Sequence, residues 1–177
     1  MNMNLLIVGA GTYAVVAAEI AANMGCFHQI DFVDDVRKTT PDGRPVVGTT
    51  EDLPALAERY SNIAVAIGNP RVRLALLGKI RESMPYKIVS LISPQAYIAP
   101  SAQLKSGCIV EPMAVVQSLC VIGEGCILSA GAVVNHAAVC AEGVHVDCNA
   151  TIPGYAQVSA GVKVNCGQVF EGGSNNV

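Results

Sequence analysis

Short apolar runs alternate with segments of helical length in the first half of the chain. The predicted strands are residues 4–8, 30–33, 63–67 and 87–91, and the predicted helices are residues 12–24, 51–60 and 70–83. Strands that alternate with helices are typical of a parallel α/β sheet. The first 92 residues therefore predict a small Rossmann-like domain, too short to hold both halves of a full dinucleotide-binding fold.

A second pattern, with a period of six residues, runs from Ile98 to Val169. Every sixth residue from Ile98 to Val164 is apolar, and the residue four places after each is small and apolar up to Val162. Helices repeat near 3.6 residues and strands near 2, so neither explains this period. Hexapeptide periodicity indicates a parallel β-helix of about four coils, in which three hexads complete one coil.

The change of pattern predicts two domains and a tail. We expect the α/β domain over residues 1–92 and the hexapeptide-repeat β-helix over residues 93–170. Residues 171–177, EGGSNNV, have a composition that favours a flexible tail.

Low charge excludes some functions. Charged residues make up 14% of the 177, and the net charge is −3, so the chain lacks the basic surface that binds nucleic acid. The most apolar stretch, residues 125–141, contains Asn135 and His136 and keeps the period of six, so we expect no membrane span. Because the repeats carry few charges, we expect their faces to be covered in a homo-oligomer.

Cysteine usage bears on localisation and metals. The N-terminus has no basic residue ahead of its apolar run, so it does not resemble a secretion signal, and seven cysteines then predict reduced thiols in the cytoplasm. No spacing typical of a zinc site occurs, and we expect no metal. Four cysteines fall on inward positions of the repeat, where a thiol acts as a small hydrophobic group: Cys108, Cys120, Cys126 and Cys140.

The opening LLIVGAGTYA has the pattern of a nucleotide-binding loop. Gly9 and Gly11 lie between a predicted strand and helix, where glycines permit a tight turn and the helix N-terminus faces a phosphate. The next strand ends in Asp34 and Asp35, which could accept hydrogen bonds from a ribose or a base. The alternative is a glycine turn needed only for close packing of strand and helix.

Two further features leave alternatives open. Gly68 and Asn69 follow the third strand, at the sheet edge where ligands bind, and are either ligand contacts or a simple turn. His136 occupies an outward position of its hexad, and His145 follows nine residues later. A lone histidine is more often structural than catalytic, so the pattern by itself does not assign His136 a role.

Five stretches of the sequence resemble one family: VGAGTYAVV, FVDD, AIGNPRVR, LISPQAYIAPSA and ILSAGAVVNHAAV. The chain resembles, over residues 4–170, the bacterial sugar acyltransferases that acetylate sialic acid or the amino group of nucleotide-linked sugars, as in the UDP-bacillosamine pathway. The resemblance implies a small α/β domain for the nucleotide sugar and a left-handed β-helix that forms homotrimers and binds acetyl-CoA. UDP-amino sugars are the favoured substrates, and a hydroxyl acceptor is the other option.

The same resemblance implies roles for individual residues. His136 would be the general base that takes a proton as the sugar nucleophile attacks the thioester. His145, Gly154 and Cys166 would lie along acetyl-CoA, and Ser129 would touch the sugar. The implied nucleotide-sugar site comprises Gly11, Thr12, Tyr13, Asp34 and Asp35, with Gly68 and Asn69 as further candidates.

Three departures from the family pattern favour an alternative. Ala137 stands where the family has a carboxylate that orients the base, Tyr13 replaces a histidine, and the hexads stop at Val169. Glu142 and Asp147, of this chain or of a neighbouring subunit, are the candidates to substitute for the carboxylate. A non-catalytic trimeric scaffold or sugar-nucleotide-binding protein is therefore the main alternative, and an NAD-dependent oxidoreductase or an acyltransferase for a substrate other than a sugar are lesser ones.

Overall fold

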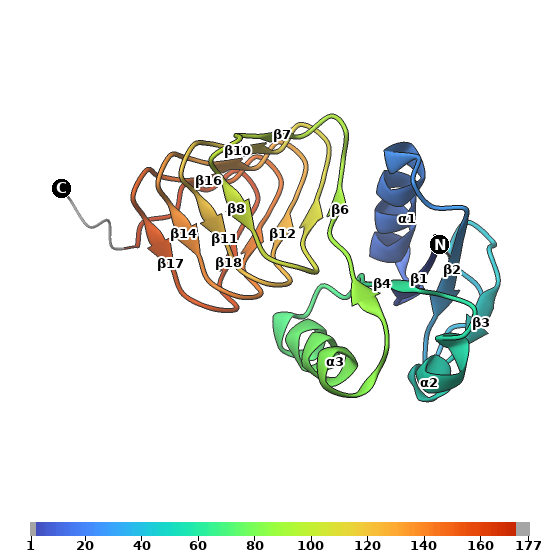
Figure 1. Cartoon of the computed structure of the whole chain (residues 1–177). Coiled ribbons are helices and arrows are strands. Elements are labelled where there is room, and N and C mark those ends of the chain that lie inside the picture. The colour runs from blue at the N-terminus through green and yellow to red at the C-terminus, as the bar shows by residue number, and fades with distance from the viewer. Residues whose placement is uncertain (1–2, 173–177) are drawn as a thin grey trace. The chain divides into compact units, whose positions relative to one another are not determined.

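The computed structural model describes residues 3–172, and these residues form two compact units that meet in sequence between Leu91 and Ile92 (Figure 1). The first unit is an α/β domain with a parallel sheet, and the second is a left-handed parallel β-helix. The predicted fold class is therefore confirmed. Of the predicted tail 171–177, residues 173–177 lie outside the described part of the chain.

The first unit contains a parallel sheet in the order β3-β2-β1-β4-β5. Its strands are β1 (Asn4–Val8), β2 (Gln29–Val33), β3 (Val46–Gly48), β4 (Asn62–Val65) and β5 (Lys87–Ile88). Its helices are α1 (Thr12–Met24), the 3-10 turn η1 (Thr50–Asp52), α2 (Leu53–Leu56) and α3 (Pro70–Ser83). From β1 the chain adds β2 and β3 on one side of the sheet, and then β4 and β5 on the other side. Open α/β sheets bind ligands at such a point of reversal, which here lies between β1 and β4.

Small residues let α1 approach this sheet closely. Ala14, Ala17, Ala18 and Ala21 are fully buried on one face of the helix, and the i, i+3, i+4, i+7 spacing puts them on a single stripe. The helix ends at Met24 and is capped by Gly25, whose left-handed φ of 67° allows its N–H to donate to the carbonyl of Ala22.

Two sequence predictions in this unit were wrong. The predicted helix over 51–60 is only η1 and α2, because Thr49 and Asp52 form a capping box that starts a short turn and the chain leaves the helix at Ala57. The predicted strand over 87–91 is two strands in different sheets, β5 and β6 (Leu91–Ile92). The strand β3 was not predicted, since its apolar run is only three residues long.

The second unit stacks two-residue strands into three parallel sheets, with orders β16-β13-β10-β7, β17-β14-β11-β8 and β18-β15-β12-β9-β6. After β6 the strands are β7 (Tyr97–Ile98), β8 (Gln103–Leu104), β9 (Ile109–Val110), β10 (Val115–Val116), β11 (Val121–Ile122), β12 (Ile127–Leu128), β13 (Val133–Val134), β14 (Val139–Cys140), β15 (His145–Val146), β16 (Thr151–Ile152), β17 (Gln157–Val158) and β18 (Lys163–Val164). Each residue pairs with the one eighteen later, as Val116 does with Val134. The last coil closes with a bridge between Thr151 and Val169.

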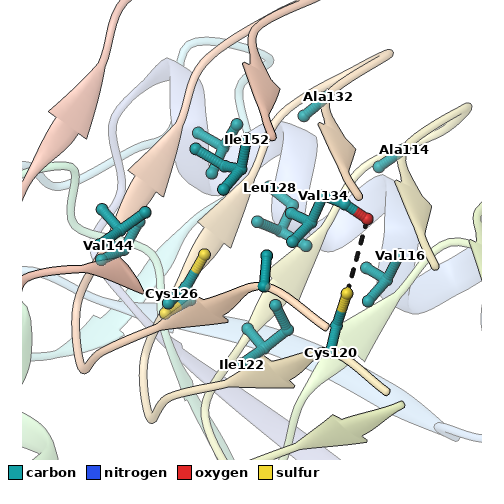
Figure 2. Packing of buried hydrophobic residues seen from close by; sticks show 14 of the residues in the cluster. Ala114, Val116, Cys120, Ile122, Cys126, Leu128, Ala132, Val134, Val144 and Ile152 are labelled. Atoms are coloured by element: carbon teal, nitrogen blue, oxygen red, sulfur yellow. Dashed lines mark hydrogen bonds between the residues drawn. The ribbon is translucent and has the colours of Figure 1, made fainter. Parts of the chain in front are cut away.

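The period of six produces the core of this unit. Figure 2 shows inward side chains such as Val116, Ile122 and Leu128 packed together, all fully buried. The four cysteines predicted to face inward are buried. The thiols of Cys108, Cys120 and Cys126 also donate to carbonyls of the next coil, and Cys120 Sγ lies 3.0 Å from Asn135 O and 3.6 Å from Val134 O (Figure 2). Burial raises the pKa of the Cys140 thiol to about 12, so this group stays protonated and inert.

The three corners of the β-helix differ in their turn residues. The glycine corner (residues 105–108, 123–126, 141–144 and 159–162) has glycine at every left-handed position: Gly107, Gly125, Gly143 and Gly161. The His136 corner (residues 117–120, 135–138 and 153–156) has none and uses Leu119, Ala137 and Tyr155 with φ between 55° and 64°. The Ser129 corner (residues 111–114, 129–132, 147–150 and 165–168) is mixed. Because a side chain in this region costs about 1 kcal/mol, strain concentrates at the His136 corner.

Candidate functional site

A pocket of about 260 Å³ opens at the carboxyl ends of β1, β2 and β4. Gly9, Asp34, Asp35 and Thr50 line its polar side, and Val8, Val33, Ile67, Val72 and Leu76 line its apolar side. The pocket lies at the reversal between β1 and β4, the position expected for a ligand site in this topology.

The two glycines of the first loop have different reasons to be glycine. Gly9 has a φ of 110°, and a Cβ there would lie 3.0 Å from Ala66 O, so the fold itself requires it. Gly11 has an ordinary φ of −82° and open space around it. Packing and backbone strain therefore do not require a glycine at position 11, which is the N-cap of α1.

Thr12 and Tyr13 form the first turn of α1 beside this loop. Thr12 is exposed, and Tyr13 is half-buried. Their position at the start of the helix, directly after Gly11, is the one predicted from the motif.

Asp34 supports the glycine loop. Its carboxylate accepts hydrogen bonds from the backbone N–H of Ala10 at 2.8 Å, Val36 at 2.9 Å and Arg37 at 2.8 Å. Burial opposes ionisation of this group, but the three N–H donors and the charge of Arg37 outweigh it and lower the pKa of Asp34. Asp35 likewise accepts from the N–H and hydroxyl of Thr50, at 2.8 and 2.9 Å. Both carboxylates thus line the pocket while already bonded to the protein.

The loop after β4 is held by an arginine that sequence reasoning missed. Arg73 is fully buried, and its guanidinium donates to the carbonyls of Ile67 at 2.7 Å and Gly68 at 2.9 Å. Asn69 caps α3 by accepting from the N–H groups of Arg71 and Val72, which favours the turn interpretation for Asn69. Gly68 has open space around it, as Gly11 has. The sequence feature that could have identified Arg73 is its position four residues after the helix cap Asn69, which places it on the buried face of α3.

His136 lies in the turn between β13 and β14 and is exposed. Its Nδ1 is 3.1 Å from Asn135 Oδ1. Its ring meets the Tyr155 ring edge to face, with 5.2 Å between centroids. Its Nε2 faces Gly154, where a Cβ would come within 3.0 Å of that nitrogen. The structure therefore brings together His136 and Gly154, two of the predicted site residues.

A second group gathers around Ser129, which is buried at the Ser129 corner. Its hydroxyl is 3.1 Å from Nε2 of His145, so these two predicted residues also meet. Asp147 forms an ion pair with Lys163 at 2.8 Å and lies 3.9 Å from His145 Nε2. The hydrogen bond from Lys163 is the main reason why the pKa of Asp147 is lowered.

Within one chain these two groups occupy different corners of the β-helix. The turn with Ser129 precedes β13 and the turn with His136 follows it, so the two lie at opposite ends of that strand. Asp147 lies at the Ser129 corner, and Glu142 lies at the glycine corner. Neither of these two candidates for the missing carboxylate therefore shares the corner of His136 within this chain. Cys166 is exposed at the Ser129 corner, one coil beyond Cys148.

Two other features of residues 3–172 bear on function. No group of three histidine, cysteine or acidic side chains in this range is arranged to hold a metal ion. None of the helices described is long and apolar enough to cross a membrane.

Comparisons with known proteins agree with this architecture. The sequence profile of the PglD N-terminal domain matches residues 4–80. The acetyltransferase domain of PglB from Neisseria gonorrhoeae, solved with acetyl coenzyme A, is 30% identical, with a TM-score of 0.84 over 97% of this chain and 95% of that one. A mutant of perosamine N-acetyltransferase from Caulobacter crescentus, solved with CoA and GDP-perosamine, is 28% identical, with a TM-score of 0.75 over 96% and 89% of the two chains.

A more distant structure shows the same fold. WeeI from Acinetobacter baumannii is 18% identical, with a TM-score of 0.70 over 94% of this chain and 88% of that one. None of the curated proteins compared with the sequence matches it significantly.

Proposed function

Because this chain belongs to the bacterial sugar acyltransferases, we propose that it transfers acetyl from acetyl-CoA to an amino group of a nucleotide-linked sugar, with His136 as the general base. The observation that carries this proposal is the setting of His136. Its ring is exposed, held at Nδ1 by Asn135, and directs Nε2 toward the space that Gly154 leaves open.

The reaction that this geometry supports is a direct acyl transfer. The neutral amine attacks the thioester carbonyl, a C–N bond forms and the C–S bond breaks. The proton released by the amine passes to His136 Nε2 and from there to the departing CoA sulfur, which leaves as the thiol. An imidazole suits this role because its ordinary pKa lies near neutrality, and such base catalysis contributes about 10² to 10⁴ in rate.

The pocket of the first unit supports binding of the nucleotide part of the substrate. The start of α1, at Gly11 and Thr12, follows the pocket residue Gly9 in the chain and has no side-chain cap, and a helix start of this kind favours a diphosphate. Asp34 and Asp35 retain further lone pairs that can accept from a ribose or a base. A UDP-amino sugar is our favoured substrate, and the GDP-linked amino sugar bound by the Caulobacter relative is the natural comparison.

The β-helix supports a homotrimer. The groups around His136 and Ser129 lie at different corners of one chain, so a neighbouring copy is needed to bring His145 and Ser129 to His136. The two sheets beside the His136 corner have eight outward strand residues, four of which are partly exposed valines: Val115, Val121, Val133 and Val139. The other four are Tyr97, Gln103, Thr151 and Gln157. Leu119, at the corner itself, is 66% exposed. Such an apolar surface favours contact with a second copy.

In a trimer the acyl donor would bind where these corners meet. His145, Gly154 and Cys166 are the residues that we assign to acetyl-CoA, and Ser129, hydrogen-bonded to His145, is assigned to the sugar.

Acetyl transfer tests the proposal. Wild-type protein should acetylate a UDP-linked or GDP-linked amino sugar in the presence of acetyl-CoA, detected by mass spectrometry because seven cysteines would disturb a thiol assay. His136→Ala should lower kcat by about 10² to 10⁴, whereas His28→Ala, which removes an exposed histidine of the other unit, should not. An active wild type with an unaffected His136→Ala variant would refute the base. Absence of both transfer and acetyl-CoA binding would favour the scaffold.

A further inference from the structure

We propose that Asn135 is the positioning residue for His136, and that it fixes the imidazole tautomer with a neutral amide in place of a carboxylate. This inference rests on the proposed role of His136 as the base. It assigns to Asn135 a task that residue 137, an alanine here, cannot perform.

The hydrogen bonds around Asn135 define which way its amide points. Asn135 Oδ1 lies 3.1 Å from the backbone N of His136 and 3.1 Å from the ring Nδ1 of His136. A backbone N–H can only donate, and an amide NH₂ cannot accept, so the atom facing it must be the oxygen. The same oxygen therefore faces Nδ1.

This orientation determines the tautomer of His136. Because Asn135 Oδ1 can only accept, Nδ1 of the neutral ring carries the hydrogen, and Nε2 carries the lone pair. Nε2 is the atom that faces the space beside Gly154. The basic nitrogen is thus directed to the open side of the turn.

Asn135 itself is held firmly by the coils on either side. Its N–H donates to Ile152 O at 3.0 Å in the following coil, and its carbonyl accepts from Ala138 N at 3.2 Å and from Cys120 Sγ at 3.0 Å in the preceding one. The amide is therefore attached to a fixed part of the backbone, which is what a positioning group needs.

The amide of Asn135 differs from a carboxylate in carrying no charge beside the His136 ring. A carboxylate at this place would stabilise the imidazolium and keep the base protonated up to higher pH. The turns stacked on either side, residues 117–120 and 153–156, contain no Asp, Glu, Lys, Arg or His, and their titratable groups are the inward Cys120 thiol and the Tyr155 phenol. The charge introduced by Asn135→Asp would therefore act without competition from those turns.

Two variants separate tautomer control from charge. Asn135→Ala should lower kcat about tenfold with KM little changed, because both tautomers become populated and the ring loses its anchor. Asn135→Asp should keep most of kcat at high pH but move the acidic limb of the pH–rate profile upward by roughly half to one pH unit, since the pair is exposed and partly screened. Asn165→Ala, the same residue type at the same hexad position of the Ser129 corner, should change neither the pH profile nor the state of His136.

A measurement without substrate keeps this inference separable from the proposed function. The ¹⁵N shifts of the labelled His136 ring should show hydrogen on Nδ1 in the neutral wild type, a mixture in Asn135→Ala, and a higher titration midpoint in Asn135→Asp. An unchanged tautomer in Asn135→Ala, or an unchanged midpoint in Asn135→Asp, would overturn the role of Asn135 even in an active enzyme. The predicted ring shifts in a protein without transferase activity would support the role of Asn135 and refute only the catalytic function.

Discussion

Gly154 is the residue that leaves room for the His136 ring. Its φ is not left-handed, and a Cβ would meet Nε2 and Cε1 of His136 at 3.0 and 3.1 Å. A glycine at this place is thus explained by the neighbouring side chain and not by its own backbone. This contact was invisible in the sequence, where the two residues are separated by a full coil.

Gly154→Ala should reduce catalysis with little effect on folding. The new methyl group displaces the ring by a few tenths of an ångström, and such a misplacement of a base costs about tenfold in kcat. Gly78→Ala is the matched control, because Gly78 lies within α3 with open space around it and alanine there should stabilise the helix by about 0.5–1 kcal/mol. Steady-state kinetics and thermal unfolding of both variants check this. Full activity of Gly154→Ala would show that the ring position is not critical.

At the scale of secondary structure, strands could be predicted from the sequence where the apolar side chains repeat with a single period. The inward residues of β9 to β18 repeat every sixth position, and the strands and their register follow from that repeat alone. The turn side chains do not follow the period, because their directions depend on local hydrogen bonds. For this reason Asn135 and Arg73 were missed, although both lie within the motifs that pointed to the site.

The loop between β1 and α1 is held by Asp34, which follows β2 and accepts a hydrogen bond from the backbone N–H of Ala10. Asp34→Asn replaces one carboxylate oxygen with an NH₂ that faces a backbone N–H, so at least one hydrogen bond is lost. At pH 7 we expect the free energy of unfolding to fall by about 1–2 kcal/mol. Glu58→Gln, which removes an exposed carboxylate with the same change of charge, should leave this free energy within about 0.5 kcal/mol of wild type.

The effect of Asp34→Asn should depend on pH. The folded-state pKa of Asp34 lies below its ordinary value of 3.8. The carboxylate therefore contributes stability that is fully present above the unfolded pKa and is lost as the pH falls through the folded pKa. The difference between wild type and Asp34→Asn should thus shrink as the pH falls below 3.8. Urea unfolding at neutral and acidic pH measures it, and a difference that stays constant would contradict the role of the charge.

At the scale of the whole molecule, the structure places the predicted site residues in separate groups, and one chain does not show how these groups meet. The predicted residues form three groups: the pocket of the α/β unit, the pair His136 and Gly154, and the pair Ser129 and His145. His136 and Gly154 lie one coil apart in the sequence, and Ser129 and His145 lie 16 residues apart, so the stacking of the coils brings each pair together. How the groups combine depends on the assembly, which the periodicity of one chain does not encode.

Leu119→Lys tests that assembly. Leu119 is 66% exposed at the His136 corner, with a left-handed φ of 64° that lysine would share. The substitution should leave the isolated chain as stable as wild type, but a charge buried between copies costs several kcal/mol. We therefore expect the wild type to sediment as a trimer and Leu119→Lys as a monomer with acetyl transfer lost. Val36→Lys, at an 85% exposed valine of the other unit, should sediment as wild type does. A trimeric Leu119→Lys protein would place the contact between copies elsewhere, and His136 would then have to work with residues of its own chain alone.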